Sequence, residues 1–280
     1  MSPRDSSSAL SAPRTEPRVS AASKVVICGL NKSFRRREGD LVVLQDVDLL
    51  VRAGEFVCLL GPSGCGKSTL LNIVAGFEQP TAGSLRIDGG PPRRPGPDRA
   101  VVFQESALFP WLTVRDNVTF GPRIQRHKRG SFEQKAQRTI DLVGLNGFED
   151  HYPDQLSGGM KQRVGIARCL LMQPKLFLMD EPFGALDAQT RLQMQELLLH
   201  VWETLKRTVI FITHDIDEAI LLADTVYVMS ARPGRIRSRN PVDLPRPRDV
   251  DMLTDQTFNA LRRDILRQIR EEAGKSGMAH

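Results

Sequence analysis

Residues 61–69 read G-P-S-G-C-G-K-S-T, which is a glycine-rich pattern able to bind phosphate. The apolar run 56–60 comes before it and the apolar-periodic stretch 70–75 follows, so the order predicts a strand, a loop and a helix. Glycines let the backbone close around phosphate oxygens, and successive N–H groups and a helix N-terminus favour anions. We therefore expect a bound nucleoside triphosphate. Its expected contacts are Gly61, Pro62, Ser63, Gly64, Cys65, Gly66, Lys67, Ser68 and Thr69.

Two carboxylates and a histidine follow buried apolar runs further along the chain. Asp180 ends the run 175–180 and Glu181 comes next, and His214 follows the run 208–213. In open α/β sheets, ligands bind at the carboxyl ends of the strands. The acidic pair could hold a metal ion and orient a water, although a salt bridge or a helix cap is an alternative. A lone histidine in this place is more often structural.

The segment 156–160 reads L-S-G-G-M and opens another expected helix, which extends to about residue 171. Ser157, Gly158 and Gly159 also have the character of a phosphate-binding helix start. Because the loop at 61–69 already has that role, these residues need a different explanation.

The surrounding elements predict an α/β fold. Short strands at 25–27, 41–44 and 48–51 make the N-terminal part β-rich, and the stretch 113–145 is mostly helical with a break at Gly130. We expect a P-loop NTPase (RecA-like) core with an N-terminal antiparallel β subdomain and an inserted α-helical subdomain. The expected domains are a disordered tail at 1–23, an ATPase domain at 24–245 with its helical lobe at about 105–170, and a C-terminal helical extension at 246–280.

The composition is that of an ordinary soluble globular protein. The chain has 280 residues, 40% of them hydrophobic, and a formal net charge of +6. No apolar run approaches the roughly 18 residues of a membrane span, and no signal-peptide core is visible. The four cysteines are scattered, so we expect neither a zinc site nor a disulfide framework. A basic charge balance alone would permit binding of nucleic acid or of an anionic membrane surface.

Taken together, the motifs resemble those of the ATP-binding subunits of ABC transporters, over roughly residues 24–235. Residues 61–69 match the Walker A loop, and residues 156–160 match the signature motif, with Met160 in the usual place of Gln. The other matches are Gln104 (Q-loop), Asp180 (Walker B), Glu181 (catalytic glutamate), residues 185–187 (D-loop), His214 (switch histidine) and Phe34 (the aromatic that stacks on adenine).

The resemblance implies roles for these residues. Lys67, Gln104, Glu181 and His214 form the catalytic set, with Glu181 as the general base or water-orienting group. Ser68, Gln104 and Asp180 hold Mg²⁺. Ser157, Gly158, Gly159 and Asp187 contact the ATP of a second copy, so that two subunits bind two nucleotides head to tail.

Three segments are most similar to nitrate, sulfonate and taurine import subunits. They read F-Q-E-S-A-L-F-P-W-L-T-V at 103–114, M-D-E-P-F-G-A-L-D at 179–187 and S-A-R-P-G-R-I at 230–236. This resemblance implies uptake of a small anionic solute. The implied partners are a transmembrane permease and, indirectly, a solute-binding protein outside the membrane, with no nucleic acid. The implied location is peripheral, on the cytoplasmic face of the inner membrane. The alternative is a non-transport ABC ATPase acting on nucleic acid or ribosomes. The sequence shows neither the long coiled coil nor the second cassette of such proteins, and it does not identify the solute.

Four further expectations concern individual side chains. Phe109 and Trp111 belong to an apolar patch that suits a permease helix, with local packing as an equally weighted alternative. Cys65 should have a lowered pKa and react fastest with maleimide, unless it faces away from the nucleotide. The arginines between 232 and 248 are interpreted as a solvated loop. The apolar face of the last helix (Phe258, Leu261, Ile265 and Ile269) should pack on the domain itself.

Overall fold

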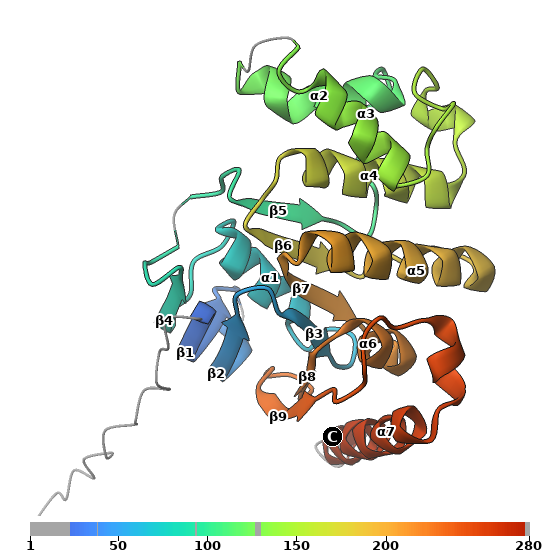
Figure 1. Cartoon of the computed structure of the whole chain (residues 1–280). Coiled ribbons are helices and arrows are strands. Elements are labelled where there is room, and N and C mark those ends of the chain that lie inside the picture. The colour runs from blue at the N-terminus through green and yellow to red at the C-terminus, as the bar shows by residue number, and fades with distance from the viewer. Residues whose placement is uncertain (1–22, 38, 93, 127–129, 278–280) are drawn as a thin grey trace, which may run out of the picture.

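The computed structural model describes residues 23–277, except for 38, 93 and 127–129. Its two sheets and surrounding helices have the arrangement that the sequence predicts, which confirms the α/β fold class (Figure 1). The expected disordered tail lies outside the described residues except for Ser23, which begins the first strand.

The smaller sheet is antiparallel, with the order β2-β1-β4. It consists of β1 (Ser23–Phe34), β2 (Leu41–Arg52) and β4 (Ala82–Ile87). The two short strands expected at 41–44 and 48–51 are one continuous strand, which corrects the sequence reading. Asp46 takes a positive φ of 54°, and its N–H donates to Asn31 Oδ1 at 3.1 Å. The polar interruption is thus absorbed as an irregularity in the pairing instead of a turn.

The larger sheet has the order β5-β6-β7-β3-β8-β9 and is parallel except for its last strand. Its strands are β3 (Phe56–Leu60), β5 (Arg99–Val102), β6 (Leu176–Asp180), β7 (Thr208–Thr213), β8 (Thr225–Met229) and β9 (Ile236–Pro241). In β3, Val57 and Leu59 face one core cluster while Phe56 and Leu60 face the other. Burial on both faces explains why the central strands read as continuous apolar runs.

Helices cover both faces of this sheet. Helix α1 (Lys67–Ala75) packs in the core between the two sheets, and α5 (Ala188–Leu205) and α6 (Ile216–Leu222) pack on the opposite face. Helices α2 (Val114–Ile124), α3 (Glu133–Leu142) and α4 (Gly158–Leu171) pack together as the separate helical layer at the top of Figure 1. Short 3₁₀ helices occupy Pro153–Gln155 and Val250–Thr254.

The C-terminal helix α7 (Gln256–Gly277) packs on the domain, as its apolar face predicts. Phe258 and Ile265 are completely buried, and Leu261 and Ile269 pack against the same core. The arginines before it are not all solvated, because Arg248 is 5% exposed and Arg246 stacks on Trp202. The solvated-loop interpretation is therefore wrong for these two residues, which bind backbone carbonyls that would otherwise lack donors.

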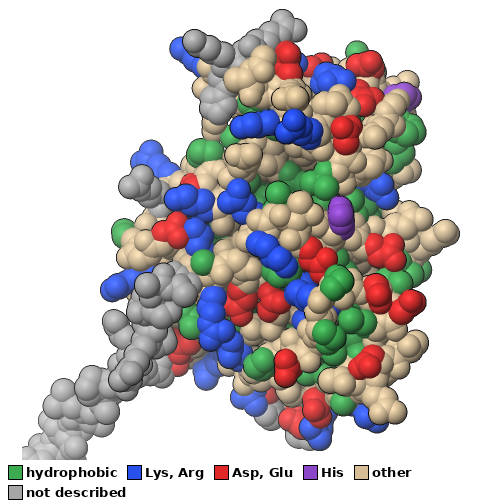
Figure 2. Space-filling model, in the orientation of Figure 1, with side chains coloured by type: hydrophobic (Ala, Val, Ile, Leu, Met, Phe, Trp, Pro, Cys, Tyr) green, Lys and Arg blue, Asp and Glu red, His purple; other side chains and the backbone are tan. Residues whose placement is uncertain are grey.

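Charges of both signs share the visible surface. Figure 2 shows Lys and Arg side chains mixed with Asp and Glu over one face. Within the described residues, no helix combines the length and the apolar character needed to cross a membrane.

Candidate active site

The phosphate loop (residues 61–69) connects β3 to α1 through two left-handed glycines. Gly64 has a φ of 74° and Gly66 a φ of 101°, a region that disfavours other residues. A Cβ added at Gly66 would also lie 2.7 Å from Leu44 Cδ2, so the loop packs directly on β2. The glycine spacing thus sets both the turn and its close approach to the neighbouring sheet.

Lys67 is buried at the start of α1 and folds over the loop. Its Nζ donates to the carbonyl of Gly61 at 2.8 Å and to that of Pro62 at 3.1 Å. The same Nζ lies 3.8 Å from Glu181 Oε1. Backbone carbonyls and a carboxylate therefore hold the ammonium over the phosphate loop.

A cavity of about 350 Å³ adjoins the loop. It is lined by Phe34, Arg36, Leu41, Val43, Ser63, Gly64, Gly66, Lys67, Ser68, Thr69, Glu181 and Arg232. The structure thus brings Phe34 and the loop together, as expected of one nucleotide site. Sequence reasoning missed the remaining wall residues: Arg36, Leu41, Val43 and Arg232.

Arg232 is the least expected of these, because its segment was interpreted as solvated. Its guanidinium donates to the carbonyl of Gly64 through Nε at 3.3 Å and through Nη2 at 3.2 Å. The available signal was the order of the strands: β8 is parallel to β3, so the turn after β8 lies at the same sheet edge as the phosphate loop.

Asp180, Glu181 and His214 meet at the carboxyl edge of two neighbouring strands, β6 and β7. Glu181 Oε2 lies 2.9 Å from His214 Nδ1, and the Glu181 N–H donates to the carbonyl of Ile212 at 3.0 Å. Glu181 takes a positive φ of 44°, a strained backbone conformation of the kind found at functional sites.

The Ser68 hydroxyl lies close to the Asp180 carboxylate. Burial raises the pKa of Asp180, while the interaction with Ser68 acts in the opposite direction. The pair places two hard oxygen donors side by side between the phosphate loop and β6, which is a donor set suited to Mg²⁺.

Gln104 lies just beyond the end of β5, the strand next to β6. A Cβ added at Gly184 would lie 3.3 Å from Gln104 Nε2, so the amide rests against the turn that follows Glu181. The parallel register of β5, β6 and β7 thus brings Gln104, Glu181 and His214 to one edge.

The signature residues do not line this cavity. Ser157 is the N-cap of α4 and accepts from the Met160 N–H at 3.3 Å, and both Ser157 and Gly158 are exposed. Asp187 is an exposed N-cap of α5, and its hydrogen bonds with Thr190 lower its pKa. Gly159 is buried, and a Cβ added there would lie 2.5 Å from Thr190 Cγ2. Within one chain, these four residues remain outside the nucleotide cavity.

Cys65 does not have the character that its place in the loop predicts. The residue is 1% exposed, and burial raises the pKa of its thiol, so the prediction of a lowered pKa is wrong. Its Sγ packs beside Gly61, and the turn after β8 covers its backbone. Desolvation therefore outweighs the field of Lys67, which acts in the opposite direction.

In the apolar patch after Gln104, Phe109 is half-buried and Trp111 is exposed. The Phe109 ring packs 4.3 Å from that of Phe120, whereas Trp111 is 70% exposed. Phe103 and Phe77 are also exposed and stack on each other, with centroids 6.5 Å apart. Local packing therefore accounts for part of the Trp111 ring, which lies 5.6 Å from that of Phe109, but leaves most of it exposed.

Comparisons with known proteins identify the family of the chain. Residues 44–184 match the family model described as ABC transporter. The chain is 48% identical over 219 residues to the nitrate import ATP-binding protein NrtD of Synechocystis, covering 78% of this chain and 82% of NrtD. It is 51% identical over 213 residues to the taurine import ATP-binding protein TauB of Burkholderia pseudomallei, covering 76% of this chain and 82% of TauB.

A solved structure is also similar to this chain. The dimeric ATP-binding cassette MJ0796, in a post-hydrolysis state bound to ADP and Pi, matches with a TM-score of 0.68 and 30% identity. The match covers 79% of this chain and all of that chain. With the phosphate loop, the signature sequence and the strand-end carboxylates in one fold, the chain belongs to the ABC transporter family, among its ATP-binding subunits.

Proposed function

We propose that the chain binds and hydrolyses MgATP in a head-to-tail homodimer and couples hydrolysis to solute uptake through a membrane permease. One observation carries the proposal. The cavity gathers Phe34, Lys67 and Glu181, while Ser157 and Gly158 lie exposed outside it. A phosphate-binding helix start without a cavity of its own is explained if it completes the site of a second copy.

The residues that line the cavity support ATP as its ligand. Phe34 lies at the end formed by β1 and β2, where an aromatic ring and the side chains of Leu41 and Val43 offer an apolar wall for adenine. At the other end, Lys67 and the loop N–H groups hold the β and γ phosphates. Arg36 and Arg232 add positive charge along the same wall.

Mg²⁺ would be held by Ser68 and Asp180, whose oxygens lie near each other, with Gln104 reaching from the next strand end. The ion would neutralise charge on the transferred phosphoryl group. Glu181 then orients the attacking water and accepts its proton, since its carboxylate lies at the same edge. His214, hydrogen-bonded to Glu181, orients both the water and the γ-phosphate.

The relatives and the exposed patch support import rather than work on nucleic acid. NrtD and TauB carry out nitrate and taurine import by name. Trp111, exposed beside the Q-loop, offers an apolar contact for a short cytoplasmic helix of the permease. We infer that the solute is a small anion, delivered by a binding protein outside the membrane. We also infer that this chain lies peripherally on the cytoplasmic face of the membrane.

A growth experiment tests the proposal. A strain lacking the gene is grown with taurine or an alkanesulfonate as the sulfur source, or with nitrate as the nitrogen source. We expect the strain to lose growth on at least one of these, and the wild-type gene but not Glu181→Gln to restore it. Undiminished growth and undiminished uptake of all three labelled solutes would contradict the importer assignment.

A further inference from the structure

Helix α6 begins two residues after His214, so its placement sets where the histidine lies. Asp215 caps the helix by accepting from the N–H groups of Asp217 at 2.9 Å and Glu218 at 3.1 Å. On the other side, His214 follows directly on β7. The histidine thus occupies a short connection between a rigid strand and a seven-residue helix.

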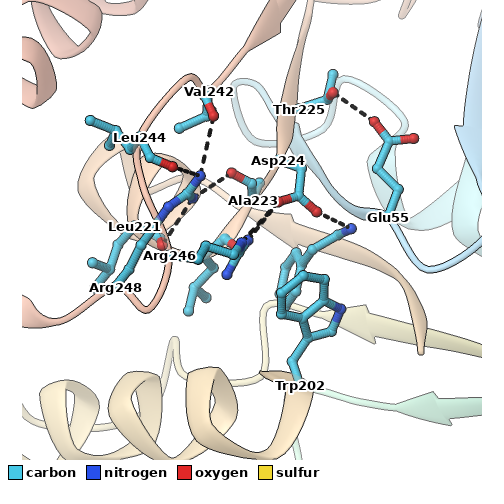
Figure 3. A network of polar contacts seen from close by, with 12 residues as sticks. Glu55, Trp202, Leu221, Ala223, Asp224, Thr225, Val242, Leu244, Arg246 and Arg248 are labelled. Carbon is cyan, nitrogen blue, oxygen red and sulfur yellow. Dashed lines mark hydrogen bonds and ion pairs between the residues drawn. The ribbon is translucent and has the colours of Figure 1, made fainter. Parts of the chain in front are cut away.

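The last carbonyls of a helix have no partners within the helix. In α6, Arg246 and Arg248 bind these carbonyls (Figure 3). Arg248 Nη1 donates to the carbonyls of Ile220 at 3.1 Å, Leu221 at 3.3 Å and Ala223 at 2.7 Å. Arg246 Nη2 donates to the carbonyl of Leu222 at 2.8 Å. Two cations at a helix C-terminus also favour the negative end of its dipole.

Both arginines make further contacts that fix their positions. Arg248 also donates to the carbonyls of Val242 and Leu244 in its own segment, and burial lowers its pKa to about 10, so it stays charged at neutral pH. Arg246 pairs with Asp224 Oδ1 at 2.8 Å, and its guanidinium lies 4.0 Å from the centroid of the Trp202 ring (Figure 3).

The first turn of α6 is also bound, through an ion pair with α7. Arg262, on α7, pairs with Asp217 Oδ2 at 2.8 Å, and the buried Phe258 on the same helix holds α7 against the core. Residues 242–265, named here the C-terminal segment, therefore contact α6 at both ends.

We propose that Arg246, Arg248 and Arg262 are positioning residues that act through α6 on His214. This inference rests on the proposed function, in which His214 works on the γ-phosphate with Glu181. The bond between His214 and Glu181 is 2.9 Å long, and hydrogen bonds weaken steeply when their geometry is lost. A shift of about 1 Å at a catalytic group can cost about 100-fold in rate. The C-terminal segment thereby sets the rate of hydrolysis without touching the nucleotide.

The test measures MgATP hydrolysis by the full-length protein carrying Arg248→Met, His214→Ala or both. Methionine keeps much of the buried volume but removes the donors. We expect Arg248→Met to lower kcat at least 10-fold and to change KM less than 3-fold. Because Arg248 acts through His214, adding Arg248→Met to His214→Ala should cause little further loss. Arg248→Lys, which retains a cation, should restore part of kcat.

The outcomes separate the inference from the function on which it rests. If His214→Ala hydrolyses ATP normally, the role given to His214 in the proposed function fails. If His214→Ala lowers kcat but Arg248→Met keeps the wild-type kcat, the positioning role is overturned. It is also overturned if the two losses multiply in the double variant.

A surface pair keeps the test decisive if Arg248→Met does not fold. Arg262→Ala should lower kcat, while Arg263→Ala, at the exposed next position on α7, should not. Equal rates in these two variants, with equal thermal midpoints, would overturn the proposal.

Discussion

Replacing Gly234 by alanine should weaken ATP binding although this residue lies outside the phosphate loop. Gly234 is in the turn after β8, where its N–H donates to the carbonyl of Val43 at 2.8 Å. An added Cβ would lie 2.0 Å from the carbonyl oxygen of Cys65, and real Cβ contacts stay beyond about 3.0 Å. The two backbones must therefore separate by about 1 Å.

That displacement falls on the N–H groups that would hold phosphate. A hydrogen bond to a charged group contributes about 2 kcal/mol, so losing one raises Kd about 30-fold. Kd is measured by titration calorimetry with MgATP on a Glu181→Gln background, which prevents turnover. Gly234→Ala should raise Kd by about this factor, while its far-ultraviolet circular dichroism stays native.

Gly83→Ala is the matched control. Its Cβ would lie 2.2 Å from the carbonyl oxygen of Gly29, a comparable clash in the antiparallel sheet. This variant should lose thermal stability but keep the Kd of its folded fraction. Wild-type affinity in Gly234→Ala would refute the reasoning, because the phosphate loop would then tolerate the displacement.

Three other predictions concern the site and its surroundings. Glu181→Gln should lower kcat for ATP at least 100-fold with little change in Kd, because the amide keeps the shape but cannot accept the proton; near-normal turnover would remove Glu181 from the catalytic role. Replacing Phe109 and Trp111 together by alanine should abolish uptake while MgATP binding persists, because the exposed Trp111 ring and its neighbour Phe109 are expected to contact the permease; an unfolded double variant would contradict this and support local packing. In maleimide labelling read by peptide mass, Cys65 should react more slowly than the half-buried Cys28, since burial raises its pKa; faster labelling of Cys65 would contradict this.

The parts of the fold that follow a local pattern could be predicted from the sequence. The strand, loop and helix around Lys67 are set by apolar runs and glycine spacing, so their order was readable. Glu181 and His214 were found because each directly follows a buried strand, and parallel strands bring such residues to one edge.

What escaped prediction depends on neighbours distant in the sequence. The field of Lys67 suggested a reactive Cys65, but the turn after β8 buries it, and burial had the larger effect on its pKa. Arg248 was interpreted as solvated because it lies in a Pro/Arg-rich stretch. The residues around it in the sequence do not indicate that it binds carbonyls of α6. Strand β9 was missed since its sequence, I-R-S-R-N-P, has one aliphatic residue and ends in proline, so it lacks the apolar pattern of the central strands.

The central claim, that ATP binds between two copies, is tested most directly by the mass of the Glu181→Gln protein in solution. Sedimentation equilibrium should give the 31.3 kDa monomer without nucleotide and twice that mass with MgATP. Adding Ser157→Arg should keep ATP binding to the phosphate loop but return the mass to that of the monomer. A monomer in saturating MgATP, or a dimer that Ser157→Arg leaves intact, would contradict the shared site.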